Sequence, residues 1–275
     1  MKNFLYLVLE LIIFSLLFLL VIDKLLVYIS NNSKNIDVNR PSMMKNNEYD
    51  IVFFGSSKIK HGIDTKVFQN NNISTFNFGI TGGATLVESY YLAQEFFTHS
   101  YAGKYAVFEI SPVREGIPNC INKFLLFHEK DLWIDYFNHY DYNFQKIPFF
   151  RLRLTTFESF ENIVLNIFFE ASDLSSNGFV PLQFSESVKN SYVSSYQIDS
   201  EWIQKISTIC NSMKIKPLFL LMPTMNKYEI LVSDTTILNH SNIIKKEKYF
   251  YDSKHLNADG ATFYSQYLLD NIFNH

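Results

Sequence analysis

The sequence predicts an α/β domain built on a central parallel sheet and preceded by one N-terminal transmembrane helix. Short continuous apolar runs, which are typical of strands buried on both faces, alternate with segments of helical periodicity. This alternation indicates βαβ units and a parallel sheet. Glycine, serine or proline follows the apolar runs, at the sheet edge where parallel sheets gather their reactive groups. With 275 residues, the chain is long enough for one well-buried domain with insertions.

The N-terminal segment is the clearest single element. Phe4 to Ile22 is apolar except for Glu10, and the apolar character continues to Tyr28. A helix of this length crosses a hydrocarbon core of about 30 Å. A cleaved signal peptide would have a shorter apolar core and a small-residue cleavage site, which we do not find. We therefore predict an uncleaved signal anchor over residues 1–29, with lysines on both sides giving only a weak signal for its orientation.

A polar stretch and an aromatic stretch define the domain boundaries in the rest of the chain. Residues 30–48 are polar, lack periodicity and contain Pro41, so we predict a linker between the anchor and a domain at 49–275. An aromatic insertion at about 114–200 interrupts that domain. An insertion of this size either covers the active-site edge or docks against a partner or the membrane.

Within the domain, apolar runs and their flanking residues predict four strands and two helices. One helix is expected to begin near Ala84, and apolar residues spaced at helical intervals after Leu256 predict a closing amphipathic helix. The strands are predicted at Ile51–Phe54, Ser74–Phe78, Tyr105–Ile110 and Leu218–Met222.

Composition argues against some partners. The formal net charge of −3 gives no support for a nucleic-acid partner. Cys120 and Cys210 are the two cysteines of the chain, which is too few for a cysteine metal cluster or a disulfide framework, although one bridge could form outside the cytoplasm. A metal site needs several convergent ligands, which the sequence does not suggest, and the serine chemistry considered below needs no cofactor, so we expect neither.

Gly55-Ser56-Ser57 directly follows the first predicted strand. At such a strand-to-helix turn, the Ser57 hydroxyl would project from the sheet edge beside unpaired N–H groups that favour a developing anion. The alternative is that Ser56 or Ser57 only caps the helix, as serines often do. His61, in the turn after this short helix, is expected to be a surface residue.

Asp252 and His255 form a second candidate pair near the C-terminus. The spacing of three residues in a turn lets the carboxylate bind one imidazole nitrogen and leaves the other nitrogen to face a serine. With Ser57 they supply a nucleophile, a base and an orienting acid. The alternative is a capped helix start with an incidental histidine. The remaining candidates, His128, His139 and His240, have no comparable setting.

Acyl transfer also needs donors for the oxyanion. The backbone N–H groups of Ser57 and Gly79 are the natural candidates, because glycine allows a substrate to approach the backbone closely.

In chain order, these segments resemble the blocks of the SGNH (GDSL-type) hydrolase superfamily. The first block is Gly55-Ser56-Ser57, the second is Asn77-Phe78-Gly79-Ile80-Thr81-Gly82-Gly83, and the last is Asp252-Ser253-Lys254-His255-Leu256. The resemblance implies a flavodoxin-like three-layer α/β fold, with Ser57 as nucleophile, Asp252 and His255 as acid and base, and Gly79 as oxyanion donor. Two departures occur: Ser56 replaces the usual aspartate, and Glu109-Ile110-Ser111-Pro112 replaces the Gly-x-Asn block. Ser111 could substitute for the missing asparagine, and Asn77 is a more remote candidate.

Within this superfamily, the chain is most similar to membrane-anchored cell-envelope proteins, including DltD-like proteins and those of polysaccharide O-acetylation. The similarity implies a single-pass protein of the cell membrane with an extracytoplasmic catalytic domain. It also implies an acylated glycan or glycopolymer as substrate and a membrane-bound acyltransferase as partner. Hydrolysis and transfer both remain open, because either water or a sugar hydroxyl could receive the acyl group. The alternative from another class is a non-catalytic scaffold or glycan-binding protein.

Overall fold

The computed structural model describes residues 2–32, 37–44, 47–110, 119–124, 130–140, 176–183, 193–196, 198–225, 227–230 and 237–273. Most of the predicted insertion at about 114–200 lies outside these residues. The chain divides into two compact units, each described by itself below. The first comprises Met1–Asn39 and Ile121–Glu170, and the second comprises Arg40–Cys120 and Ala171–His275.

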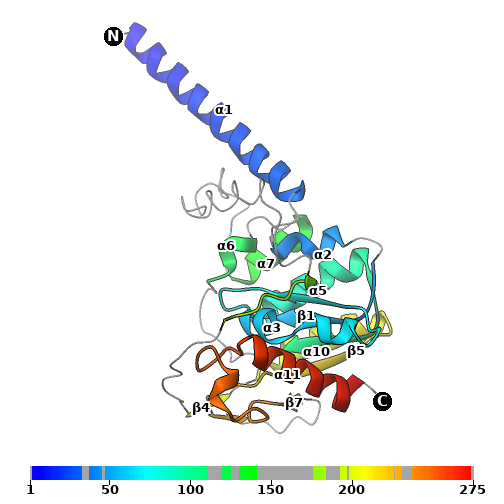
Figure 1. The fold of residues 1–275 in the computed structure, drawn as a ribbon. Helices are drawn as coiled ribbons and strands as arrows, with labels where there is room; N and C mark the ends of the chain where they lie inside the picture. Colours follow the sequence, from blue (N-terminus) through cyan, green and yellow to red (C-terminus); the bar gives the residue numbers. More distant parts are fainter. Residues whose placement is uncertain are drawn as a thin grey trace. The chain divides into compact units, whose positions relative to one another are not determined.

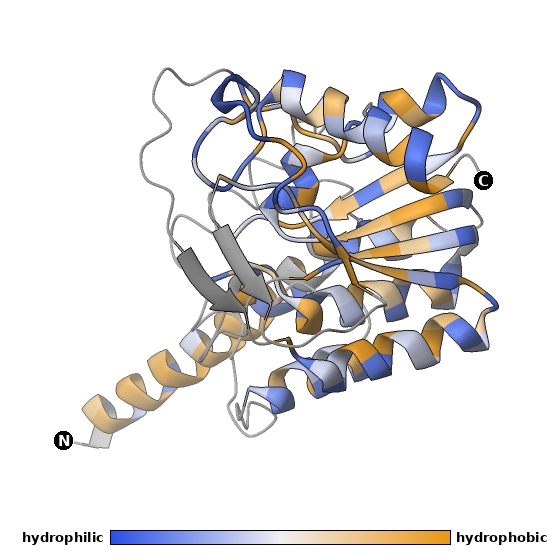
Figure 2. Cartoon of the chain, turned by 90° about the horizontal axis from the view of Figure 1, so that it is seen from below, coloured by the Kyte–Doolittle hydropathy of each residue, from blue (hydrophilic) through white to orange (hydrophobic). Residues whose placement is uncertain are grey.

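Within its described residues, the first unit contains one long apolar helix and three short helical elements. Helix α1 is uninterrupted in Figure 1, and most of its length is hydrophobic in Figure 2. Its segment Phe4–Leu25 is long and apolar enough to cross a membrane, and large hydrophobic side chains along it are exposed. Such a surface is stable in a bilayer and costly in water. The elements of this unit are α1 (Lys2–Asn32), η1 (Asp37–Asn39), α6 (Ile121–Phe124) and α7 (Lys130–His139).

The second unit is built on a five-stranded parallel sheet with the order β2-β1-β3-β5-β7. Phe78, Phe54, Phe108 and Phe219 lie side by side across four of the strands. The ring centroids of neighbouring members are 5.2, 5.2 and 5.9 Å apart, so this aromatic row fixes the register of the strands. The strands are β1 (Glu48–Gly55), β2 (Thr75–Gly79), β3 (Tyr101–Glu109), β5 (Lys216–Leu221) and β7 (Ile237–Asn239).

Helices cover both faces of this sheet, as Figure 2 shows. One group packs together on one face: α3 (Ser57–Gly62), α4 (Thr65–Gln69) and α11 (Ala258–Leu268). The other group comprises α2 (Arg40–Met43), α5 (Leu86–His99) and α10 (Ser200–Ser212). Side-chain caps begin several of these helices; Thr85 and Glu88 form a capping box at α5, and Asn257 caps α11.

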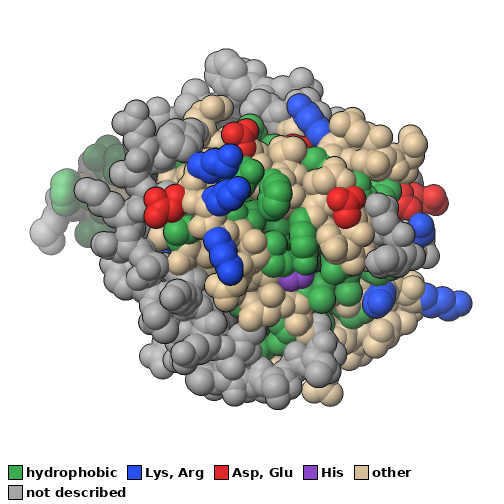
Figure 3. Space-filling view, turned by 60° about the horizontal axis from the view of Figure 1, so that its bottom comes forward, with side chains coloured by type: hydrophobic (Ala, Val, Ile, Leu, Met, Phe, Trp, Pro, Cys, Tyr) green, Lys and Arg blue, Asp and Glu red, His purple; other side chains and the backbone are tan. Residues whose placement is uncertain are grey.

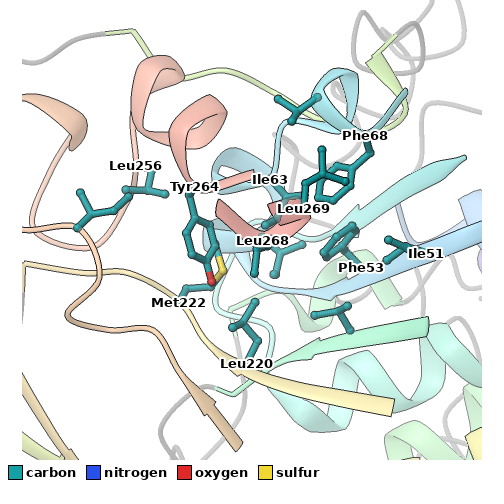
Figure 4. Packing of buried hydrophobic residues seen from close by; sticks show 14 of the residues in the cluster. Ile51, Phe53, Ile63, Phe68, Leu220, Met222, Leu256, Tyr264, Leu268 and Leu269 are labelled. Atoms are coloured by element: carbon teal, nitrogen blue, oxygen red, sulfur yellow. The ribbon is translucent and has the colours of Figure 1, made fainter. Parts of the chain in front are cut away.

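A continuous hydrophobic core lies between the sheet and the helix group that contains α11. Figure 4 shows Phe53 of β1 and Leu220 of β5 facing Leu268 and Tyr264 of α11. Each of these four side chains is at most 1% exposed. This packing fixes α11, and with it the loop that precedes α11, relative to the carboxyl ends of β1 and β5.

The smaller elements complete the second unit. Strands β4 (Val193–Tyr196) and β6 (Lys227–Ile230) form a separate two-stranded parallel sheet. The 3₁₀-helix η4 (Glu247–Tyr249) precedes the loop before α11, and the π-helix η5 (Leu269–Phe273) follows α11.

The structure agrees with the four predicted strands and both predicted helices, and it contains further elements that the sequence did not predict. Strand β7 was not anticipated, because three residues are too few to show a periodic pattern. Part of the segment predicted as a linker at 30–48 is helical, since α1 continues to Asn32 and α2 spans Arg40–Met43. Arg40 and Ser42 of α2 are only 3% exposed, so polar residues are buried here by packing that composition does not reveal.

Candidate active site

The Gly55-Ser56-Ser57 turn gives its two serines different structural roles. Strand β1 ends at Gly55, and Ser56 caps α3 by accepting a hydrogen bond from Lys58 N–H at 3.2 Å. Ser57 is the first residue of α3 and is partly exposed. Its Oγ lies 2.8 Å from His255 Nε2. Ser56 therefore performs the capping that was the alternative interpretation, and Ser57 faces the histidine.

Asp252 and His255 form the next link of the same hydrogen-bond chain. His255 Nδ1 lies 2.8 Å from Asp252 Oδ2 and 3.0 Å from Oδ1. Burial acts to raise the pKa of Asp252, but hydrogen bonds from the His255 ring and from the Lys254 and His255 N–H groups lower it to about 2. An ionised carboxylate only accepts, so Nδ1 carries the proton and Nε2 is left to accept from Ser57 Oγ–H.

The loop that carries Asp252 and His255 is held by the ends of two other elements. A bridge between Phe250 and Leu256 closes the loop, and Tyr251 N–H donates to His255 O at 2.9 Å. After β5, Thr224 Oγ1 donates to Ser253 O at 2.8 Å, and Met225 N–H donates to the same oxygen at 3.0 Å. The segment after β5 therefore has a definite role, which is to fix the position of the base loop.

A buried carboxylate holds the nucleophile turn from behind. Glu109 ends β3 and is 1% exposed. Its Oε2 accepts hydrogen bonds from both Ser56 N–H and Ser56 Oγ, each at 2.7 Å. Its Oε1 lies 3.6 Å from Lys58 Nζ, which compensates the buried charge. A Cβ at Gly55 would lie 2.6 Å from Glu109 Cβ, so this approach needs glycine at the end of β1. The two departures from the SGNH blocks, Ser56 and Glu109, are thus in direct contact.

The oxyanion roles predicted for Gly79 N–H and Asn77 stay predictions, and in this structure both groups donate hydrogen bonds within the protein. Gly79 N–H donates to Asn77 Oδ1 at 2.9 Å. Asn77 Nδ2 donates to Ile59 O at 2.8 Å and Ile63 O at 3.2 Å, and the side chain is buried. Asn77 therefore joins β2 to α3. Gly79 is required for packing, since a Cβ there would lie 2.7 Å from Lys60 Cα. Ser111, the other predicted side-chain donor, lies outside the described residues.

The loop that follows β2 starts directly beside the nucleophile turn. Ile80 N–H donates to Gly55 O at 2.9 Å. Gly82 and Gly83 have positive φ values of 104° and 80°, a conformation that favours glycine. A Cβ at Gly82 would lie 3.2 Å from Cys120 N. Glycine in this loop therefore serves both a left-handed turn and a close backbone approach, at the same sheet edge as Ser57.

His61 also belongs to this site, although the sequence predicted only a surface position. Its ring centroid lies 6.1 Å from that of His255, at an interplanar angle of 80°. Its Nδ1 lies 2.7 Å from Val180 O. Burial is the main cause that lowers the pKa of His61, and the charge of a protonated His255 would lower it further. The segment that buries His61 follows it by more than a hundred residues, so no local pattern could have indicated it.

The remaining histidines have other surroundings. His240 is 6% exposed, and its Nδ1 lies 2.9 Å from Tyr264 Oη. Burial lowers its pKa to about 4. His139 ends α7 beside Tyr140, and His128 lies outside the described residues. Among the described residues, no three His, Cys, Asp or Glu side chains are grouped so that they could hold a metal ion.

The face drawn in Figure 3 carries hydrophobic side chains together with charged side chains of both signs. In Figure 3, a histidine reaches the surface among hydrophobic side chains, and several lysine or arginine side chains lie on the same face. The side chains of Ser57, His61 and His255 are all partly exposed, so a ligand can reach them from solvent.

Comparison with known proteins gives little further information. No family model and no curated protein matches the chain. A solved structure from Streptococcus pneumoniae, provisionally described as a platelet activating factor, is similar at 15% sequence identity with a TM-score of 0.34. The match covers 92% of this chain and 99% of that one. At this level of similarity, it assigns no activity to the present chain.

Proposed function

We propose that this chain is a membrane-anchored serine esterase or acyltransferase of the SGNH type that acts on acylated cell-envelope glycans or glycopolymers. The observation that carries the proposal is the continuous chain from Ser57 Oγ through the His255 ring to Asp252, with 2.8 Å at each link. The order β2-β1-β3-β5-β7 supports it, because this is the order of flavodoxin-like sheets when the strands are numbered within the sheet.

In the first half-reaction, Ser57 Oγ attacks the carbonyl carbon of an acyl ester, and His255 Nε2 takes the serine proton. The Asp252 carboxylate stabilises the imidazolium that forms and keeps Nδ1 protonated. The tetrahedral intermediate collapses when the bond to the leaving oxygen breaks, and His255 gives its proton to that oxygen. An acyl ester on Ser57 remains.

In the second half-reaction, water or a sugar hydroxyl attacks the ester on Ser57. His255 takes the proton of the attacking group and returns it to Ser57 Oγ when the acyl bond breaks. Water as acceptor makes the protein a hydrolase, and a sugar hydroxyl makes it a transferase. The same residues serve both reactions, so the acceptor alone separates them.

The oxyanion of both half-reactions needs hydrogen-bond donors, and Gly79 N–H and Asn77 Nδ2 already donate within the protein in this structure. Ser57 N–H and Gly82 N–H are the proposed pair, because Ser57 follows β1 and Gly82 follows β2 at the carboxyl edge of the sheet. Removing one such donor typically lowers the rate by about 10²–10³.

The apolar helix α1 supports the location of this activity. A single span Phe4–Leu25 would anchor the domain at the cell membrane, and the resemblance to envelope proteins favours the extracytoplasmic side. There the domain would meet its glycan substrate and a membrane-bound acyltransferase partner. A scaffold without catalysis is the competing function, but it does not require a Ser57–His255 distance of 2.8 Å.

Product analysis of envelope glycans tests this proposal. Cells that carry Ser57→Ala in place of the natural protein should show changed acyl content of one envelope polymer. A lower content indicates a transferase, and a higher content indicates a hydrolase. Unchanged acyl content with normal amounts of the Ser57→Ala protein would contradict the proposed substrate class.

A further inference from the structure

His61 lies beside the Ser57–His255 pair but takes no part in the hydrogen-bond chain that activates Ser57. Ser57 and His61 are four residues apart on α3, so their side chains share one face of the helix. The His61 and His255 rings are edge to face with centroids 6.1 Å apart. A group bound at Ser57 therefore has two imidazole rings within reach rather than one.

The orientation of His61 is set by Val180. The Val180 carbonyl oxygen can only accept, so the Nδ1 atom 2.7 Å away carries the proton. Nε2 then holds a lone pair as long as the ring is neutral. Burial lowers the pKa of His61; the Val180 carbonyl and Asp252 act to raise it, and His255 and Lys60 lower it further. His61 thus presents a neutral hydrogen-bond acceptor to the site.

The segment that contains Val180 is held firmly, which gives His61 a fixed position. Residues 176–183 make backbone hydrogen bonds to three elements: β2, α3 and the start of α11. The bonds are Asn77 N–H to Asn177 O at 2.9 Å, Val180 N–H to Lys60 O at 3.1 Å and Ala258 N–H to Leu182 O at 2.9 Å. A ring held in this way can select among ligands by hydrogen bonding.

We propose that His61 selects the acyl acceptor by binding the second hydroxyl of a vicinal diol. This inference rests on the proposed acyl-enzyme at Ser57. One hydroxyl of the diol attacks the acyl carbon and gives its proton to His255 Nε2. The bond from that carbon to Ser57 Oγ breaks, and His255 returns the proton to Ser57 Oγ. The adjacent hydroxyl keeps its proton and donates a hydrogen bond to His61 Nε2.

Geometry and chemistry both favour a diol. Adjacent hydroxyls that each make a hydrogen bond of about 2.7–2.8 Å can reach two rings whose centroids are 6.1 Å apart. Sugars and polyols carry such pairs of hydroxyls, whereas a monohydric alcohol leaves His61 Nε2 without a donor. An acceptor that covers His61 without donating to Nε2 forgoes one hydrogen bond in the bound state, and this difference gives discrimination.

Acetyl transfer to two small alcohols tests the proposal. The full-length chain in detergent receives acetyl from p-nitrophenyl acetate, with 1,2-propanediol or 1-propanol as acceptor. After correction for the number of hydroxyls, the natural protein should prefer the diol by about 2- to 10-fold, the value of one net hydrogen bond. His61→Phe keeps an aromatic ring but neither hydrogen bond, so its preference should fall to about 1.

His61→Gln is the matched control, because its amide can donate to Val180 O and accept from the diol. The His61→Gln protein should keep part of the preference for the diol. If His61 served packing alone, the His61→Phe protein would keep more of that preference than the His61→Gln protein. Labelling of Ser57 by a fluorophosphonate is measured in both variants, so that a loss of acceptor preference is separated from a loss of the Ser57–His255 reaction itself. The proposal is overturned if the natural protein shows no preference, if His61→Phe retains it, or if His61→Phe loses labelling as well. A natural protein that is not labelled at Ser57 refutes the proposed function itself, and this inference with it.

Discussion

Replacing Glu109 should loosen the nucleophile turn, because two hydrogen bonds from Ser56 end on its carboxylate. Glu109→Ala removes the acceptor of Ser56 N–H and of Ser56 Oγ–H, each at 2.7 Å in a buried setting. Each buried donor left unsatisfied costs about 1–3 kcal/mol. The loss of the carboxylate 3.6 Å from Lys58 Nζ adds to this. For the two donors together we expect a destabilisation of at least about 2–6 kcal/mol, which lies within the stability of many ordinary domains.

Thermal unfolding of the full-length chain, together with the rate of fluorophosphonate labelling, measures this effect. A loss of this size corresponds to a Tm lower by about 5–15 °C. Labelling of Ser57 should slow by about tenfold or more, because the nucleophile is no longer held in its attack geometry. Ser56→Ala is the control, since it removes one of the two donors and should cost only about 1 kcal/mol. A Glu109→Ala protein with unchanged Tm and labelling rate would refute the role assigned to this carboxylate.

Three further changes test other parts of the structure. Gly79→Ala should lower the Tm, because the new Cβ would clash with the α3 backbone. Gly103→Ala is the control and should be tolerated, because its Cβ would meet its nearest atom at 3.6 Å. Equal Tm values for the two variants would contradict this packing. Thr224→Val removes the hydrogen bond from the side chain to Ser253 O, which should lower the free energy of unfolding by about 1 kcal/mol and slow labelling of Ser57 several-fold. An unchanged labelling rate would show that the loop carrying His255 does not need this hydrogen bond. The pKa of His240 is about 4 in the folded chain, against 6.5 for an ordinary histidine. The unfolded state therefore binds more protons between pH 4 and pH 6.5, and the free energy of unfolding falls as the pH is lowered through this range. His240→Phe should flatten that fall in urea midpoints, and an unchanged slope would remove His240 as its cause.

The sheet was predictable because its strands are buried on both faces. Runs such as Ile51–Phe54 are continuous and apolar, and burial on both faces requires this. Asp252 and His255 were also predictable, because their contact is local and depends only on a spacing of three residues in a turn. Ser57 could be proposed from its place after the first strand, although the capping role of Ser56 could not be distinguished from it.

The rest of the site depends on contacts between residues far apart in the chain. Glu109 meets Ser56 across 53 residues, and His61 meets Val180 across 119. Sequence pattern shows which residues are polar, but not which partner takes each hydrogen bond. For this reason Gly79 was predicted to face a substrate, whereas its N–H bonds to Asn77.

Peptide mapping of the fluorophosphonate adduct tests the central claim most directly. The hydrogen-bond chain from Ser57 to His255 and Asp252 predicts a single adduct on Ser57 in the full-length protein. The adduct should be absent from Ser57→Ala and strongly reduced in His255→Gln. It should persist in Ser56→Ala, which leaves the nucleophile in place. Equal labelling of the Ser57→Ala protein, or an adduct on another residue, would contradict the account.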